Sequence, residues 1–300
     1  MLNFEHGAFD PFQPMSPDVK SSFTANYLEF LRAKDGSVNY GDETLSLRED
    51  VVKQRAQRPV LWKGAPVDKE AFKEFLDAKI TKESGLDSRL LWLIAAAKAN
   101  RYERYAVNIH LDEYRLSNYQ NVPEEKAYVL LEEEYHTRIL KDACAVCGLD
   151  FTLEDPPALM AFFIRRIVSL PDAINLMLLI GEVLGTHVFL MMYDQCSLFS
   201  EDPETETRMR QLCLEILADE IAHVALSRYL VHPVILRIAN AIIPGLARVM
   251  LSNAPEVGLL AGGYGQITKD LRNPIPLPPR LEWLDETGTA DVSRAAAPRV

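Results

Sequence analysis

The sequence predicts an all-α protein built on a four-helix bundle, and three observations carry that prediction. Two Glu-x-x-His motifs, at residues 133–136 and 220–223, each lie in a stretch of helical character. A second helical stretch with a suitably placed glutamate comes before each motif. One of those stretches, residues 174–193, is mostly apolar, and its single formally charged residue lies at its centre. A helix that is apolar all round is typical of the core of a bundle.

The chain before the bundle is expected to form an arm and short helices. Residues 1–20 are rich in proline and phenylalanine and predict an irregular arm. Helices are then expected at three places, residues 22–33, 44–56 and 67–81. The main domain is expected to span residues 21–272, with the bundle at about 87–230.

The bundle is predicted to consist of two helical hairpins. Pro123 suits the first turn of a helix, and the stretch at 197–203 has the composition of a loop. A shorter helix is expected at 155–169, between the hairpins. The four long helices are predicted at residues 87–117, 123–146, 171–196 and 204–230.

The part of the chain after the bundle contains further helices and a tail. Pro233 interrupts the helical pattern. An apolar helix is then expected at about 234–252, with Pro244 near its middle, and another helix at 255–271. Residues 273–300 contain the stretch PIPLPPRLEWL and a small polar end, and they predict a flexible or partner-bound tail.

The two motifs have the spacing of metal-binding pairs. Residues three apart on a helix are neighbours on one face, so Glu133 and His136 can present a carboxylate and an imidazole to one metal ion. Glu220 and His223 can do the same. One Glu-x-x-His motif is weak support, because a glutamate-rich chain produces it by chance. Here two of only six histidines stand at this spacing.

The preceding helices supply carboxylates at the matching level. Glu103 and Glu133 are equally far from the turn near residue 118, and Glu182 and Glu220 are equally far from residue 201. In an antiparallel hairpin, residues equidistant from the turn lie at the same height. Four carboxylates and two imidazoles in a bundle form the pattern of a two-metal carboxylate centre.

Glu182 supports the metal hypothesis separately. A lone buried carboxylate costs several kcal/mol unless it is paired or bound to a metal. A buried salt bridge to Arg165 or Arg166 is the alternative. A membrane span is the weaker interpretation, because Glu182 and other polar residues and glycines interrupt the run.

The order of these residues resembles that of the ferritin-like non-heme di-iron carboxylate oxygenases over about residues 90–230. That superfamily includes bacterial multicomponent monooxygenases, acyl-carrier-protein desaturases, the ribonucleotide reductase small subunit and arylamine N-oxygenases. The resemblance implies two iron ions, with manganese as an alternative, dioxygen as co-substrate and an external electron donor. The implied metal ligands are Glu103, Glu133, His136, Glu182, Glu220 and His223.

The resemblance also implies roles for two further residues. Asp219, directly before Glu220, would hydrogen-bond a metal-bound imidazole across the bundle. Thr186, one turn after Glu182, would lie beside the dioxygen pocket and take part in catalysis. A small residue at a helix crossing with Gly185 explains Thr186 equally well.

The subtype is inferred from departures among family motifs. The position of the radical tyrosine in ribonucleotide reductase is Leu140, which argues against that protein. The arylamine N-oxygenases of natural-product biosynthesis are the closest subgroup, although their third histidine is replaced by Ile216. His187 or His110 would then be the extra ligand, but each is equally an ordinary core or rim histidine. Apolar side chains that could line a substrate pocket, or simply pack the core, include Leu179, Val183 and Phe189.

Three functions remain open. The leading hypothesis is a monooxygenase that oxidises a small metabolite, with N-oxygenation of an aromatic amine as the first choice. The second is a hydroxylase or desaturase of an aliphatic or carrier-bound acyl substrate. The third is a helical metal-binding protein without catalysis, because fold alone does not determine function.

Composition limits the partners and the compartment. The net charge of −11 argues against a nucleic-acid surface and suits a basic reductase partner. A ferredoxin is the other expected electron donor. No signal peptide or membrane partner is expected, so the cytoplasm is the expected compartment, and a homodimer is left open. Cys144 and Cys147 have the spacing of a metal knuckle but lack a second pair, so they are interpreted as reduced packing thiols.

Overall fold

The computed structural model is almost wholly helical, and the predicted all-α class is confirmed. The only strand pairing among the described residues joins β1 (Ala8–Phe9) to β2 (Ile275–Pro276) in antiparallel fashion. The residues that the structure describes are 7–34, 67–117, 124–152, 155–156, 158, 161–162, 171–252 and 254–286. The helix expected at 44–56 and most of the one expected at 155–169 lie outside these ranges.

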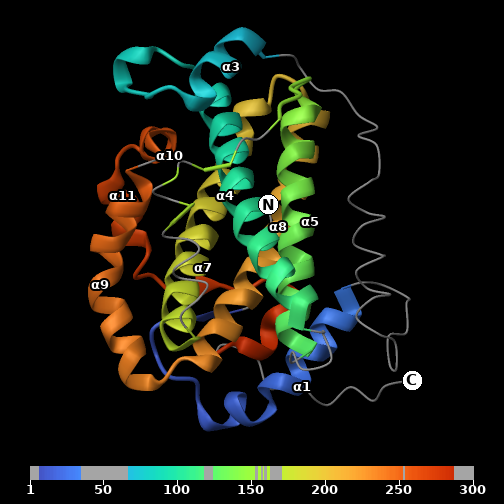
Figure 1. Cartoon of the computed structure of the whole chain (residues 1–300), viewed down its shortest axis with the longest axis vertical. Helices are drawn as coiled ribbons and strands as arrows, with labels where there is room; N and C mark the ends of the chain where they lie inside the picture. The colour runs from blue at the N-terminus through green and yellow to red at the C-terminus, as the bar shows by residue number, and fades with distance from the viewer. Residues whose placement is uncertain are drawn as a thin grey trace.

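Four long helices lie side by side in the middle of the molecule (Figure 1). Each agrees with its expected range to within two residues. The first packs on the second, the third on the fourth, and the second on the fourth. They are α4 (Ser88–Ser117), α5 (Glu124–Val146), α7 (Pro171–Asp194) and α8 (Pro203–Leu230).

Helices α4 and α5 pair in the antiparallel register that the sequence predicts. The Cys144 thiol lies 3.6 Å from the carbonyl oxygen of Leu93, and the Asn100 amide donates a hydrogen bond to the carbonyl oxygen of Thr137. Moving seven residues forward on α4 therefore moves seven residues back on α5. This register brings Glu103 level with the motif of α5.

Helices α7 and α8 form the second antiparallel pair. The Arg210 guanidinium donates to the carbonyl oxygen of Tyr193 at 3.3 Å, across the pair. Asp202 caps the first turn of α8, where its carboxylate accepts from the backbone N–H of Glu204 at 3.1 Å. Pro203 follows at the first helical position, which explains why the helix begins there.

Shorter helices surround the four long ones. Helix α1 (Pro17–Lys34) packs on α5 and α8, and α3 (Lys69–Asp77) packs on α4. Helix α9 (Pro233–Leu251) packs on α7, and α10 (Pro255–Leu260) packs on α4. Helix α3 is shorter than expected, and a 3₁₀ turn, η1 (Lys82–Ser84), follows it.

The single helix expected at 255–271 is two helices. Helix α10 ends before Gly262 and Gly263, and α11 (Tyr264–Asp270) begins after them. Both glycines have positive φ, 70° and 127°, a conformation that glycine adopts without steric cost. These two residues turn the chain, so α10 and α11 pack on different neighbours.

The prediction of a flexible tail from residue 273 is wrong for residues 275–286. After β2 comes the 3₁₀ segment η4 (Pro279–Leu284), and Leu277, Leu281 and Leu284 are fully buried. The prolines restrict the backbone while the leucines between them reach the core, so a proline-rich composition did not mean disorder here. Residues 287–300 lie outside the described residues.

The N-terminal arm is also part of the core. Phe9 and Phe12 are buried, and the arm is shorter than expected because α1 begins at Pro17. The buried Arg228 of α8 donates to the carbonyl oxygen of Gln13 and to the Glu286 carboxylate. One arginine thus joins both ends of the described chain to the fourth long helix.

We expect Leu281→Ala to lower the free energy of unfolding by about 2–5 kcal/mol, because it removes a fully buried leucine side chain from the core. Urea denaturation measures the change. Val249→Ala, at a position that is 67% exposed, is the control and should change it by less than about 0.5 kcal/mol. Equal stability of the two variants would show that the tail does not contribute to the core.

Candidate metal centre

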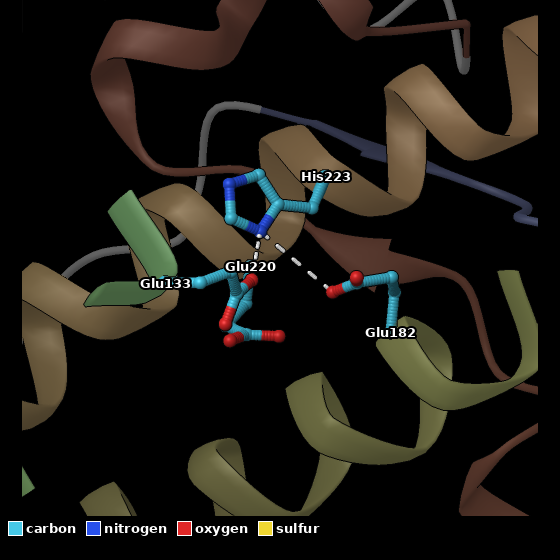
Figure 2. Close-up of side chains that lie close together, drawn as sticks. All are labelled: Glu133, Glu182, Glu220 and His223. Carbon is cyan, nitrogen blue, oxygen red and sulfur yellow. Dashed lines mark ion pairs between the residues drawn. The ribbon is translucent and has the colours of Figure 1, made fainter. Parts of the chain in front are cut away.

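The structure brings the six predicted metal ligands together in two overlapping groups. Within each group, one ligand atom from every residue lies within 4.8 Å of the others. Glu133 of α5 belongs to both groups. The first group is Glu133, Glu182, Glu220 and His223 (Figure 2), and the second is Glu103, Glu133 and His136.

Each imidazole directs Nδ1 at two carboxylates of the cluster, at least one of them from another helix. The Nδ1 atom of His223 lies 2.8 Å from Glu133 Oε1 and 3.7 Å from Glu182 Oε2 (Figure 2). The Nδ1 atom of His136 lies 3.2 Å from Glu220 Oε1 and 3.6 Å from Glu133 Oε2. The two ring centroids are 5.8 Å apart. Both imidazoles therefore face one shared cluster of oxygens.

The opposite side of each imidazole is held by a carboxylate from across the helix pair. His136 Nε2 lies 3.0 Å from Asp219 Oδ2 on α8, and His223 Nε2 lies 3.0 Å from Glu132 Oε2 on α5. An ionised carboxylate only accepts hydrogen bonds, so each Nε2 carries the proton. In a neutral imidazole, Nδ1 then keeps a lone pair directed at the cluster.

Glu132 is the residue that the sequence analysis missed. The signal was present, because Glu132-Glu133-x-x-His136 repeats the form of Asp219-Glu220-x-x-His223. An acidic residue comes directly before the motif glutamate in both helices. Comparison of the two motifs with each other would have paired Glu132 with His223.

Three buried polar atoms of the cluster have no hydrogen-bond partner. They are His136 Nδ1, His223 Nδ1 and Glu103 Oε2. The two Nδ1 atoms come close to oxygens, but not in hydrogen-bonding geometry. A buried polar atom left unsatisfied costs about 1–3 kcal/mol. Cations coordinated by these atoms would remove that cost, and the four carboxylate ligands would balance two divalent charges. The donor set therefore fits a two-metal centre.

Burial and mutual repulsion raise the pKa of two glutamates in the cluster. Burial, together with Glu133 and Glu182, raises the pKa of Glu220 to about 8. Burial and the nearby Glu133 also raise the pKa of Glu103 well above its usual value. Without cations, the Glu220 carboxyl holds a proton at neutral pH. A metal ion would have to displace that proton.

Oppositely charged neighbours shift the pKa values of the other ionisable side chains in the cluster. Burial alone would raise the pKa of Glu133, but its contacts with His136 and His223 lower it well below its usual value. Burial alone would lower the pKa of both histidines. The carboxylates of Asp219 and Glu132 outweigh it and raise the pKa of His136 and His223 respectively.

His187 is outside both ligand groups. Its Nδ1 donates to the carbonyl oxygen of Val183 at 2.8 Å, and burial lowers its pKa. It lines a cavity of about 420 Å³ between α7, α10 and α11, together with Gln195, Gln266 and Asp270. The other proposed extra ligand, His110, lies on α4, and its side chain is not among those that the structure describes.

The residues expected around a substrate pocket are buried in apolar core. Leu179 and Val183 pack in the core shared with α1 and η4, and Phe189 packs in the core shared with α3 and α4. None of them lines the cavity beside His187. Thr186 is fully buried, and its hydroxyl has no hydrogen-bond partner.

The cysteines lie apart from the cluster. Cys144 and Cys147 are buried in apolar core at the end of α5, and neither belongs to a potential ligand group among the described residues. Burial raises the pKa of the Cys147 thiol to about 12, and that of Cys144 further. Both are thiols at neutral pH, as expected of packing residues.

No protein-family model, curated protein or solved structure matches this chain. Membership of the ferritin-like superfamily therefore stays a prediction from the order of the motifs. The functional inference depends on the geometry of the cluster itself.

We expect the metal-free protein to lose stability as pH rises from about 5 to about 8. The folded chain holds the Glu220 proton up to about pH 8, while an unfolded carboxyl with the usual pKa of 4.5 has already released it. Stability from this group is therefore full below about pH 4.5 and is lost towards pH 8. One such proton changes the free energy of unfolding by about 1.4 kcal/mol per pH unit.

Urea denaturation of the metal-free protein at several pH values measures this slope. The raised pKa values of His136 and His223 also make the folded chain less stable as pH rises. The lowered pKa of Glu133 affects stability only below about pH 4.5. Glu220→Gln should flatten the slope. Glu74→Gln, an exposed position on α3, should leave it unchanged. Equal slopes in wild type and Glu220→Gln would contradict the assignment.

Proposed function

We propose that the chain is a dioxygen-dependent two-metal oxygenase of the ferritin-like type that oxidises a small organic molecule. One observation carries the proposal. Two buried imidazoles, fixed from behind by carboxylates, direct unpartnered Nδ1 atoms at four carboxylates that come from four different helices. Buried carboxylates in this number are costly in a helical core, and cations in its centre would offset that cost.

The two overlapping groups indicate how the ions would be shared. His136 and Glu103 would bind one ion, and His223 and Glu182 the other. Glu133 belongs to both groups, and Glu220 approaches both halves, so these two glutamates would bridge. The residue types suit iron or manganese. When bound, two irons supply the electrons and open positions for dioxygen reduction.

The remaining residues of the site position and shield this centre. Glu132 and Asp219 hold the imidazole rings and favour the tautomer that binds metal. The side chains of these two acids are 2% and 1% exposed, whereas those of Glu133 and Glu182 are 14% and 15% exposed. Dioxygen and substrate would therefore approach from the side of Glu133 and Glu182, away from Asp219.

The reaction subtype is the more specific part of the proposal. The resemblance of the single-protein architecture to the arylamine N-oxygenases favours N-oxygenation of an aromatic amine in natural-product biosynthesis, although Ile216 replaces the third histidine of that family. Electrons would come from a separate reductase or ferredoxin. Hydroxylation or desaturation would use the same centre, and product analysis separates these outcomes. A metal-binding protein without catalysis is the third outcome. The intact set of six ligands argues against it.

We expect the protein, reconstituted anaerobically with Fe²⁺, to hold two iron ions per chain and to consume dioxygen on mixing. Glu182→Ala and Glu220→Ala should each lose at least one ion and the oxygen reaction, because each removes a carboxylate from the cluster. Elemental analysis and stopped-flow spectroscopy measure the two properties.

Cys144→Ser is the control, because this buried residue is outside the cluster, and it should keep both properties. Wild-type iron content in both glutamate variants would contradict the ligand assignment. Two bound ions without any oxygen reaction would favour the non-catalytic alternative.

We expect Thr186→Val to keep the iron content and the fold, because valine has a similar shape and the hydroxyl that it replaces is buried without a partner. The free energy of unfolding should stay the same or rise by about 1 kcal/mol. If the hydroxyl acts on bound dioxygen, the ratio of product formed to oxygen consumed should fall. An unchanged ratio would identify Thr186 as a packing residue beside Gly185.

A further inference from the structure

Helix α9 lies at the edge of the molecule (Figure 1), and it exposes an apolar face. Six large apolar side chains are exposed in the described part of the chain, and five of them lie on this helix. Val234 is 56% exposed and Val249 is 67% exposed. The five are Val234, Ile238, Ile242, Val249 and Met250.

Four of these residues follow one stripe along the helix. Val234, Ile238 and Ile242 are four residues apart, and Val249 comes seven residues later, so all four share one face. The opposite face, which includes Leu236 and Ile243, is buried against the protein. Helix α9 is thus apolar on both faces, although only one face has a partner within the described chain.

The charges of α9 differ from those of the whole chain. The helix contains Arg237 and Arg248 and no acidic residue, in a chain with a net charge of −11. The two arginines are eleven residues apart, which is about three turns, so they lie in one row at an edge of the stripe. A positively charged edge thus borders an exposed apolar stripe.

A small hollow extends this positive edge. It has a volume of about 300 Å³ and is lined by Arg237, Asn240, Ala241 and Arg272. Neither guanidinium has a side-chain hydrogen bond or ion pair with any described residue. Two guanidiniums and an amide provide the donors that a phosphate group accepts. The hollow shares Ala241 with the exposed surface of α9, so a bound phosphate would lie next to the apolar stripe.

We propose that α9 docks the protein on a bilayer that contains anionic lipids, with the stripe in the interfacial region and a lipid phosphate in the hollow. An apolar helix face bordered by basic residues is the pattern of helices that lie in the plane of a membrane. Each basic side chain near an anionic surface adds to the attraction. This proposal goes beyond the oxygenase function and revises the expectation that no membrane is involved.

The alternative occupant, a second copy of the chain, suits these charges less well. An antiparallel two-fold pairing of α9 with itself would place Arg237 of one copy close to Arg248 of the other, on the same side. The helix has no acidic residue to neutralise them. A membrane-spanning role conflicts with the buried face of α9, which packs on α7 and α11. The helix can therefore enter a bilayer only with its exposed face.

Vesicle sedimentation of the full chain tests the proposal. The protein should bind vesicles of phosphatidylcholine and phosphatidylglycerol, bind phosphatidylcholine alone weakly, and lose binding at high salt. Arg237→Gln with Arg272→Gln should weaken binding roughly thirtyfold, about fivefold for each arginine. Lys20→Gln with Arg208→Gln removes the same charge from other helices and should have little effect.

A second pair of variants tests the apolar stripe. Ile238→Gln with Val249→Gln should weaken binding at least about tenfold, because both side chains lose apolar contact with lipid. Phe162→Gln, at an exposed apolar residue on another segment, should not. Circular dichroism confirms that each variant is folded.

Three results would overturn the proposal. The first is the absence of binding to anionic vesicles. This result overturns the proposal even if calorimetry shows that the chain binds inorganic phosphate. The second is wild-type binding by both α9 double variants. The third is a dimer in light scattering that becomes a monomer in Ile238→Gln with Val249→Gln, because α9 would then be an interface between copies.

Discussion

Two crossed carboxylate–imidazole contacts between α5 and α8 are the interaction on which the rest of the site depends. Each helix supplies one histidine to the cluster and one acid that holds the histidine of the other helix. Moving either helix along its axis would break both contacts together. The crossed pair therefore fixes the relative height of α5 and α8, which also determines where their motif glutamates meet.

This arrangement puts more negative charge in the interior than a helical core tolerates. Six acids surround two imidazoles, and burial raises the pKa of Glu103 and Glu220 in response. Within the described residues, protonation is the only relief that the chain offers by itself. Cations are the stronger relief, because they also satisfy the orphaned Nδ1 atoms. A cluster that is costly when empty is expected where function, rather than stability, determined the residues.

Much of this centre could be predicted from the sequence because helical geometry is regular. The spacing within each motif placed glutamate and histidine on one face, and equal distance from the turns placed Glu103 and Glu182 at the right height. The pairing of Glu132 needed the contact between helices, which spacing within one helix does not show. The burial of Leu281 could not be predicted from the sequence, because a proline-rich composition does not show which side chains pack against an apolar surface.

The two most apolar helices show the limit of composition most clearly. The segment Leu176–Phe199, which is most of α7 and the turn after it, and helix α9 contain windows with the same mean hydropathy of 1.7, yet the first window is 50% buried and the second 28%. Their charges separate them better than their apolar residues do. The one glutamate in the centre of α7 faces imidazole and carboxylate groups inside the molecule, where a cation held within the fold would balance them. The arginines of α9 lie at the edge of an exposed face, where an anion outside the fold would balance them. In an apolar helix, the position and sign of the few charges indicate the surroundings that the helix requires.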